Sequence, residues 1–205
     1  MAVSAEAMPV EPSEWKLPYR GRVGMACLIL TESTFFAIFV IAYLYYIGKN
    51  LNGPLPHDVI PPIYANWLVL LNSICLFVSS YTVHRAVKGL AAGDLATFKP
   101  WLLLTILLGL GFLAGTAYEW YGLIYEEGLT ISTNLFGTTF YSLVGFHAFH
   151  VIVGLMMLSL VFTLGLLGFV TSQHGERVEI LSWYWHFVDS VWVVVLITVY
   201  IVGLL

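Results

Sequence analysis

Long apolar stretches alternate with short polar breaks along most of the chain. A helix needs about 20 apolar residues to cross ~30 Å of hydrocarbon, and in lipid it satisfies its own backbone hydrogen bonds. Each stretch reaches that length. The pattern therefore predicts transmembrane helices over Val23–Ile47, Tyr64–Val87, Phe98–Leu123, Leu135–Leu167 and Ile180–Leu204.

The breaks between these stretches are short and carry turn residues. Asn52-Gly53-Pro54 and Pro61-Pro62 lie in the first connection, Gly93-Asp94 in the second and Gly128 in the third. Such connections have no room for a separate soluble domain. We expect an all-α integral membrane protein: one bundle of five transmembrane helices over residues 21–205, after a polar N-terminal tail over residues 1–20.

The composition agrees with a protein that faces lipid. Of 205 residues, 60% are hydrophobic and 10% charged, whereas soluble domains carry about 25% charged residues. The net charge of -4 gives no basic patch for nucleic acid. Cys27 and Cys75 lie in apolar stretches without metal-binding spacing, so we interpret them as buried apolar side chains and expect no metal site on this chain.

The basic residues indicate how the helices cross the membrane. Seven of the eight basic residues fall on one side if the N-terminus is cytoplasmic, and Lys49 alone falls on the other. Cytoplasmic loops are enriched in Lys and Arg. We therefore expect a cytoplasmic N-terminus and, after five spans, a C-terminus outside.

Polar residues inside the predicted spans need partners, because a charge at the bilayer centre costs ~2.5–3.5 kcal/mol. Glu32 lies about ten residues into the first span, ~15 Å from its inner edge. His147 and His150 share a helix face at a similar depth from the outer edge of the fourth span. We expect Glu32 to hydrogen bond with one of these two histidines.

Other polar residues are candidates for similar contacts. His186 and Asp189 share a face of the last span, and Glu119 lies toward the outer end of the third. His84 and Arg85 lie at the inner end of the second span, where an arginine can reach a lipid phosphate.

Three interpretations of these polar groups remain open. They join helices as structural groups, they hold a metal or haem, or they relay protons or a transported ion. His147 or His150 with His186 could supply axial haem ligands. No Glu-x-x-His pair occurs on any span, and no inverted repeat is visible, which disfavours a di-iron site and a transporter.

Five short motifs occur in a recognisable order. They are Glu32 with Phe35-Phe36, Ala117-Tyr118-Glu119-Trp120-Tyr121, Gly137-Thr138-Thr139-Phe140, Gly145-Phe146-His147-Ala148-Phe149-His150, and Leu181-Ser182-Trp183-Tyr184-Trp185-His186-Phe187-Val188-Asp189. In this order the chain resembles subunit III of the haem–copper (cytochrome c) oxidases, over residues 20–204. It departs from the family's seven-helix form by starting at what would be its third helix, and by Val83-His84-Arg85 where many relatives show paired histidines.

The resemblance implies a non-catalytic subunit of a proton-pumping cytochrome c oxidase in the bacterial cytoplasmic membrane. Haem and copper would belong to subunits I and II, and this chain would hold no cofactor besides structural phospholipid. It would pack on subunit I, alongside subunit II and small subunits, and support proton uptake and the lifetime of the catalytic core. Membership of a respiratory supercomplex stays open.

The resemblance also implies roles for individual residues. Glu32 and His147 or His150 would form the interior polar link, His84 or Arg85 would meet lipid headgroups, and Trp183, His186 and Asp189 would fix the last helix. Alternatives within the fold are subunit III of a quinol oxidase or an accessory subunit of nitric oxide reductase. An independent transporter or a haem-binding membrane enzyme is a more remote alternative.

Overall fold

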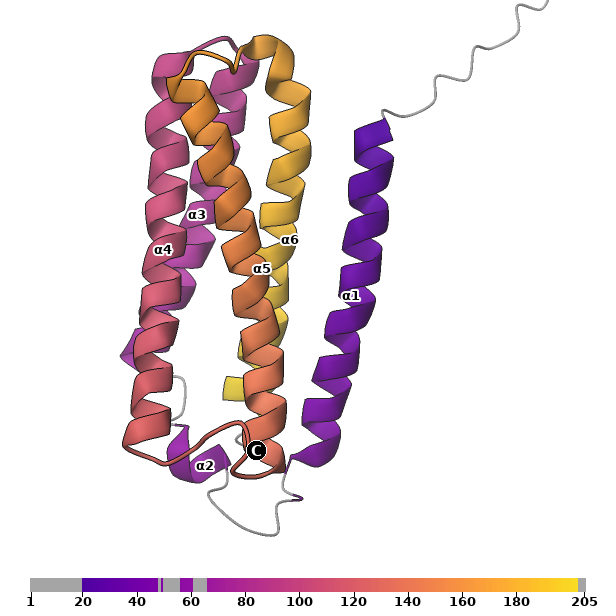
Figure 1. The fold of residues 1–205 in the computed structure, drawn as a ribbon, viewed down its shortest axis with the longest axis vertical. Helices are drawn as coiled ribbons and strands as arrows, with labels where there is room; N and C mark the ends of the chain where they lie inside the picture. The colour runs from indigo at the N-terminus through magenta and orange to yellow at the C-terminus, as the bar shows by residue number, and fades with distance from the viewer. Residues whose placement is uncertain (1–19, 48, 50–55, 61–65, 203–205) are drawn as a thin grey trace, which may run out of the picture.

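The computed structural model describes residues 20–47, 49, 56–60 and 66–202. Five long apolar helices dominate it: α1 (Arg20–Tyr46), α3 (Trp67–Ala91), α4 (Leu95–Tyr125), α5 (Leu135–Leu166) and α6 (Gly175–Tyr200). A short helix, α2 (Pro56–Val59), and a 3-10 turn, η1 (Ser172–His174), lie in the connections, and the described residues contain no strand (Figure 1). The all-α fold of five membrane-spanning helices is confirmed, whereas the orientation of the termini stays a prediction.

Three helices begin earlier than the sequence pattern predicted, and the first of them, α1, begins at Arg20 rather than at Val23. α4 begins at Leu95 because Asp94 caps it: Oδ1 of Asp94 accepts hydrogen bonds from the backbone N–H groups of Ala96 and Thr97, both at 3.0 Å. α6 begins at Gly175 rather than at Ile180, because its first turns are polar and project from the apolar part of the helix. The tail over residues 1–20 falls outside the described residues except for Arg20, and so do the predicted ends at Tyr64 and Leu204.

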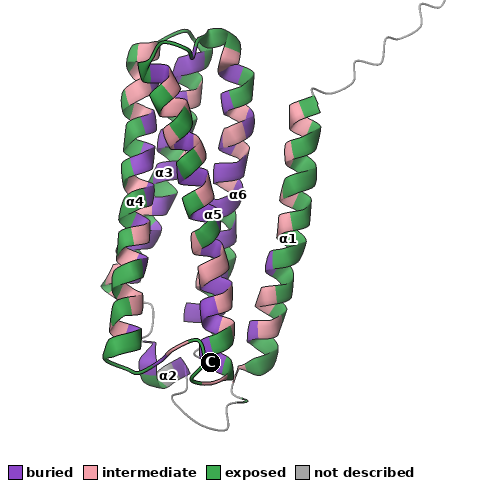
Figure 2. Cartoon of the chain, viewed as in Figure 1, coloured by how far each residue is buried: buried purple, intermediate pink, exposed green. Residues whose placement is uncertain are grey.

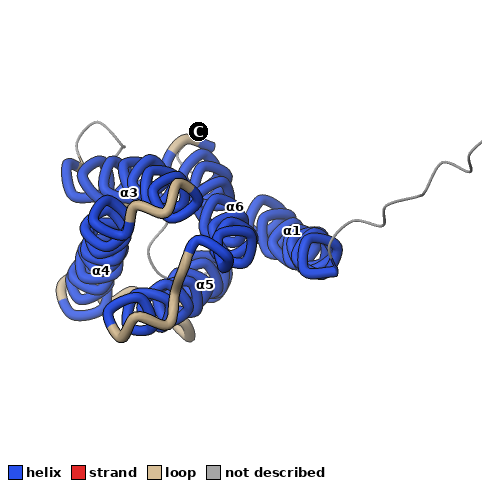
Figure 3. The backbone as a smooth tube through the Cα atoms, turned by 90° about the horizontal axis from the view of Figure 1, so that it is seen from above, coloured by secondary structure: helices blue, strands red, loops and turns tan. Residues whose placement is uncertain are grey.

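Four of the long helices form a closed ring. α3 packs on α4, α4 on α5, α5 on α6, and α6 returns to α3. Seen from the end of the bundle, α1 lies outside this ring, against α5 and α6 (Figure 3). Most of its surface is exposed, in contrast to the inward faces of the other helices (Figure 2).

Trp185 holds the ring together from its inside. This fully buried side chain of α6 lies so close to Gly109 of α4 and Gly154 of α5 that a Cβ on either glycine would come within 2.9 Å of its ring. Its indole N–H donates to Ser79 Oγ of α3 at 2.9 Å. One tryptophan thus contacts each of the other three helices in the ring.

Small residues on α4 do not all serve close packing. Gly115 lies directly against the side chain of Asn72 on α3, whereas nothing lies within 4 Å of a Cβ placed on Gly111.

The cysteines are free thiols; Cys75 is half-buried and Cys27 is exposed on α1. The interpretation of Cys27 as buried is therefore wrong for this chain alone, because none of the described residues covers Cys27.

Candidate functional site

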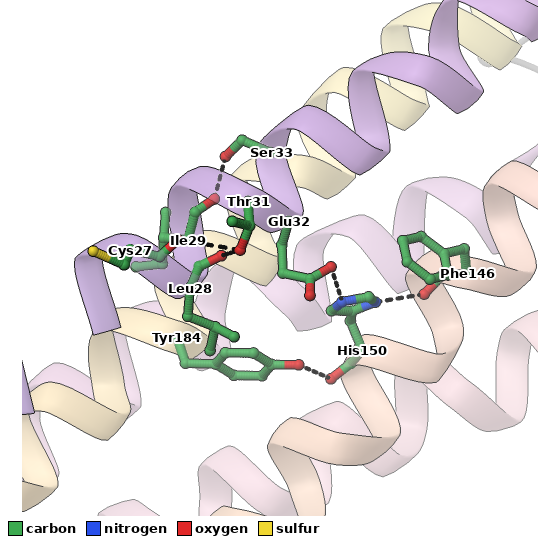
Figure 4. Close-up of polar contacts among 9 residues, drawn as sticks. All are labelled: Cys27, Leu28, Ile29, Thr31, Glu32, Ser33, Phe146, His150 and Tyr184. Atoms are coloured by element: carbon green, nitrogen blue, oxygen red, sulfur yellow. Dashed lines mark hydrogen bonds and ion pairs between the residues drawn. The ribbon is translucent and has the colours of Figure 1, made fainter. Parts of the chain in front are cut away.

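A partly buried contact between Glu32 and His150 joins α1 to α5. His150 Nε2 lies 3.2 Å from Glu32 Oε2, and His150 Nδ1 lies 2.8 Å from the backbone oxygen of Phe146 (Figure 4). A carbonyl oxygen only accepts hydrogen bonds, so Nδ1 carries a proton. A second proton then lies between Nε2 and the Glu32 carboxyl group, either as an imidazolium–carboxylate pair or as a neutral imidazole with a protonated carboxyl. The expected link between Glu32 and a histidine is confirmed.

Aromatic side chains enclose this contact. The Phe36 ring centroid lies 5.1 Å from the His150 ring, and the Tyr184 hydroxyl donates to the His150 backbone oxygen at 3.3 Å. The imidazole is nearly buried, with 7% of its side chain exposed against 26% for Glu32. Its low-dielectric surroundings strengthen the hydrogen bond to Glu32.

His147, the other candidate partner, does not contact Glu32. It lies one helical turn from His150, fully buried, and its ring stacks on Trp192 at 5.1 Å and meets the edge of Phe112 at 5.7 Å. Neither of its ring nitrogens has a hydrogen-bond partner in the described part of the chain. The structure therefore places it among aromatic rings as a packing residue.

A second polar contact joins α3 to α6. Ser80 Oγ lies 2.9 Å from Nδ1 of His186 and is also hydrogen-bonded to Oδ2 of Asp189. The shared face of His186 and Asp189 is thus confirmed, because both side chains meet the same serine. Ser80 was not predicted, since a serine within an apolar stretch gives no signal of charge.

Glu119 forms a third contact, between α4, α6 and the start of α3. Its Oε1 accepts from the Tyr200 hydroxyl at 2.9 Å and from the Asn66 amide at 3.2 Å. Neither partner was predicted. Asn66 also accepts from the backbone N–H of Val69 and so caps α3, which fixes the amide that faces Glu119.

Trp183, His84 and Arg85 lie nearer the surface. Arg22 of α1 lies 5.9 Å over the Trp183 ring. Its guanidinium also pairs with the carboxylates of Glu176 at 3.2 Å and Glu179 at 3.6 Å, in side chains 43–44% exposed, so each ion pair contributes only ~0–1 kcal/mol. Trp183, which lies on α6, therefore contacts α1. His84 and Arg85 are exposed, and Arg85 lies 5.5 Å over the Trp101 ring.

These polar groups are divided among separate interhelical contacts. Within the described ranges, no group of three or more His, Cys, Asp or Glu side chains is placed to hold a metal ion. His150 uses both ring nitrogens within the chain, and His186 directs Nδ1 to Ser80. Both of these histidines thus take part in contacts between helices.

Apolar grooves run along the outside of the bundle. One, of about 410 Å³, lies between α1 and α6 and includes Phe36, Ile41 and Phe187 in its lining. Another, of about 560 Å³, lies between α4 and α5 and includes Trp120, Tyr141 and Phe149. Both are lined by apolar and aromatic side chains, with few hydroxyl groups.

Comparison with known proteins shows, independently of the geometry, what this chain is similar to. A family model described as cytochrome c oxidase subunit III matches residues 18–204. Cytochrome c oxidase subunit 3 of Scyliorhinus canicula is 36% identical over 182 residues, which make up 87% of this chain and 68% of that protein. The human subunit 3 is 35% identical with the same coverage. Subunit 3 of Synechocystis sp. is 36% identical over 179 residues, 87% of this chain and 74% of that protein.

Proposed function

Because the chain belongs to the cytochrome c oxidase subunit III family, we propose that it serves as the non-catalytic subunit III of a proton-pumping cytochrome c oxidase. It packs directly on subunit I, with subunit II and small subunits in the same complex. Haem and copper belong to those partners. The complex lies in the bacterial cytoplasmic membrane and takes part in aerobic respiration.

The observation that carries this proposal is that the intramembrane polar groups form hydrogen bonds between helices of this chain. Glu32, His150, Ser80, Asp189 and Glu119 bind one another or neighbouring helices within the chain. Groups used in this way stabilise a particular helix arrangement. They therefore support a structural and lipid-binding role for this chain, with the oxygen chemistry on other subunits.

The outer surface supports binding of phospholipid. α1 exposes apolar side chains along its length, including Leu30, Phe35 and Ile41, and the groove between α1 and α6 continues that surface. An acyl chain fits such an apolar groove, because it asks for no hydrogen bonds. Exposed Arg85 and the indole of Trp101 beside it suit a lipid headgroup.

The contact between Glu32 and His150 supports a role in the stability of the complex. It fixes α1, which otherwise lies outside the helix ring, to α5. Lipid held against α1 and α6 then keeps a constant place beside the catalytic core. This constancy is what proton uptake into subunit I requires during turnover.

Purification of the tagged chain from its native membranes in mild detergent tests the proposal. We expect haem–copper subunits to co-purify with oxygen-reducing activity that is supported by reduced cytochrome c, and the isolated chain to show no haem spectrum. Activity with quinol but not with cytochrome c would identify quinol, in place of cytochrome c, as the electron donor of the complex. A lone chain carrying its own haem would overturn the proposal.

A further inference from the structure

The contact of Ser80 with His186 and Asp189 limits which of these three side chains can carry a proton. Ser80 Oγ lies within hydrogen-bond distance of both His186 Nδ1 and Asp189 Oδ2. A seryl hydroxyl has one proton, so Ser80 donates to only one of the two. The other side chain must then donate a proton to Ser80 Oγ.

Two proton arrangements satisfy the same atomic positions. In one, ionised Asp189 accepts from Ser80, and His186 donates from Nδ1. In the other, protonated Asp189 donates from Oδ2 to Ser80, and Ser80 donates to unprotonated Nδ1 of His186. If Nε2 of His186 carries a proton in both, the first arrangement is an imidazolium–carboxylate pair and the second is a pair of neutral side chains. They interconvert when one proton moves from carboxyl to hydroxyl and one from hydroxyl to imidazole.

The two ends of this hydrogen-bonded chain differ in how far they are buried. Asp189 is 5% exposed, and its Oδ1 has no hydrogen-bond partner among the residues that the structure describes. A buried carboxylate with a single hydrogen bond is costly, which favours a proton on Asp189. His186 is half-buried, and exposed His84 lies on α3, the helix that also carries Ser80.

We propose that Ser80, His186 and Asp189 form a proton-storing relay at the seam between α3 and α6. His186, the half-buried end, exchanges protons with the surroundings of the bundle, and Asp189, the buried end, holds the proton. The inference rests on the proposed function, because an oxidase that takes up protons gives such a store a use.

Other charged or imidazole-bearing groups on the elements packed against α6 must be told apart from the relay. Glu32 and His150 bind each other, and Arg22 pairs with Glu176 and Glu179 of α6 itself. The full set on α1, α3, α4, α5 and η1 is Arg20, Arg22, Glu32, His84, Arg85, Lys88, Lys99, Glu119, His147, His150 and His174.

Infrared difference spectra of the purified complex, recorded over a range of pH, test the relay in four forms: wild type, Asp189→Asn, Ser80→Ala and Ser190→Ala. Ser190 is a matched control, because it neighbours Asp189 on α6 but donates only to the backbone oxygen of His186. We expect the wild type and Ser190→Ala to show the carbonyl stretch of a protonated carboxylic acid, changing together with an imidazole signal. Asp189→Asn should lose that band, and Ser80→Ala should keep it but separate its pH dependence from that of the imidazole.

Two results would overturn the relay. One is an Asp189→Asn spectrum that matches the wild type at every pH; the other is a Ser80→Ala spectrum in which both signals still change together. If Asp189→Asn does not assemble, Ser80→Ala against Ser190→Ala decides alone. Recovery of the chain without haem–copper subunits would reject the proposed function instead, and the same spectra on that chain would still decide the relay.

Discussion

The indole Nε1 of Trp185 donates a hydrogen bond of 2.9 Å to Ser79 Oγ, which joins α6 to α3 at a fully buried point. The Ser79 hydroxyl in turn donates to the backbone oxygen of Leu76 at 2.6 Å. Serine is therefore both donor and acceptor, and neither group is left unpaired. This small network gives the helix ring a fixed register.

Ser79→Ala should destabilise the protein by ~1–3 kcal/mol, because it leaves the buried indole N–H of Trp185 without an acceptor. Unfolding of the purified chain in mixed micelles, followed by tryptophan fluorescence, measures the loss. Ser142→Ala is the control, since the Ser142 hydroxyl donates only to the backbone oxygen of Thr138. Equal stabilities of the two variants would contradict the importance of this bond.

Gly154→Ala should also destabilise the ring. The new Cβ would lie 2.8 Å from Cε3 of Trp185, closer than carbon atoms pack, and overpacking of this kind costs ~1–3 kcal/mol. Gly111→Ala, on the neighbouring helix, meets nothing within 4 Å and should be neutral or stabilising, because alanine favours helix. The midpoints of thermal unfolding of the two variants should therefore move apart. A Gly154→Ala midpoint at or above that of wild type would be inconsistent with the packing described.

Glu32→Ala should weaken the attachment of α1 to the ring, because it leaves Nε2 of His150 without its partner. In the purified oxidase we expect less retained phospholipid and faster inactivation during turnover, with the initial rate little changed. Phosphorus analysis and oxygen consumption over time measure these effects. Glu127→Ala, an exposed position in the loop after α4, is the control. Unchanged lipid content with unchanged inactivation kinetics would argue against the proposed role of Glu32.

Asp94 should make the stability of the α3–α4 turn depend on pH. Hydrogen bonds from Thr97 lower the pKa of this carboxyl group below its ordinary value of 3.8. A carboxyl group with a lowered folded-state pKa stabilises the fold fully above its unfolded pKa, and the contribution is lost as pH falls through the folded value. Asp94→Asn should therefore lower the unfolding midpoint at neutral pH, with the difference from wild type shrinking below about pH 4. A difference that stays constant down to acidic pH would exclude this mechanism.

The membrane fold could be predicted from the sequence because lipid imposes a simple requirement: each span needs a long apolar helix. The helix ends were less predictable. Asp94 starts α4 three residues before the apolar pattern does, and the polar first turns of α6 have no hydrophobic signal. Caps and projecting turns depend on local hydrogen bonds, which hydropathy does not measure.

The depth of the candidate site residues in the membrane was predictable from the sequence, but the rotation of each helix about its axis was not. Counting residues placed Glu32 level with two histidines, yet the choice of His150 over His147 depends on which face of α5 meets α1. That face is set by the packing of Phe36 and Tyr184 around the pair. Ser79 and Ser80 were missed because a small hydroxyl in an apolar stretch looks like any other tolerated residue.

The place of α1 outside the ring has a consequence for biogenesis. α1 is synthesised before α3 and α4, yet it packs against α5 and α6, which follow α3 and α4 in the chain. Until α5 enters the bilayer, Glu32 has no His150 to bind and must wait in lipid, at a surface or beside the insertion machinery, at a cost of about 2.5–3.5 kcal/mol if it is charged at the bilayer centre. The attachment of α1 thus waits for α5 and α6, and a stall in translation before α5 would leave α1 without these two partners.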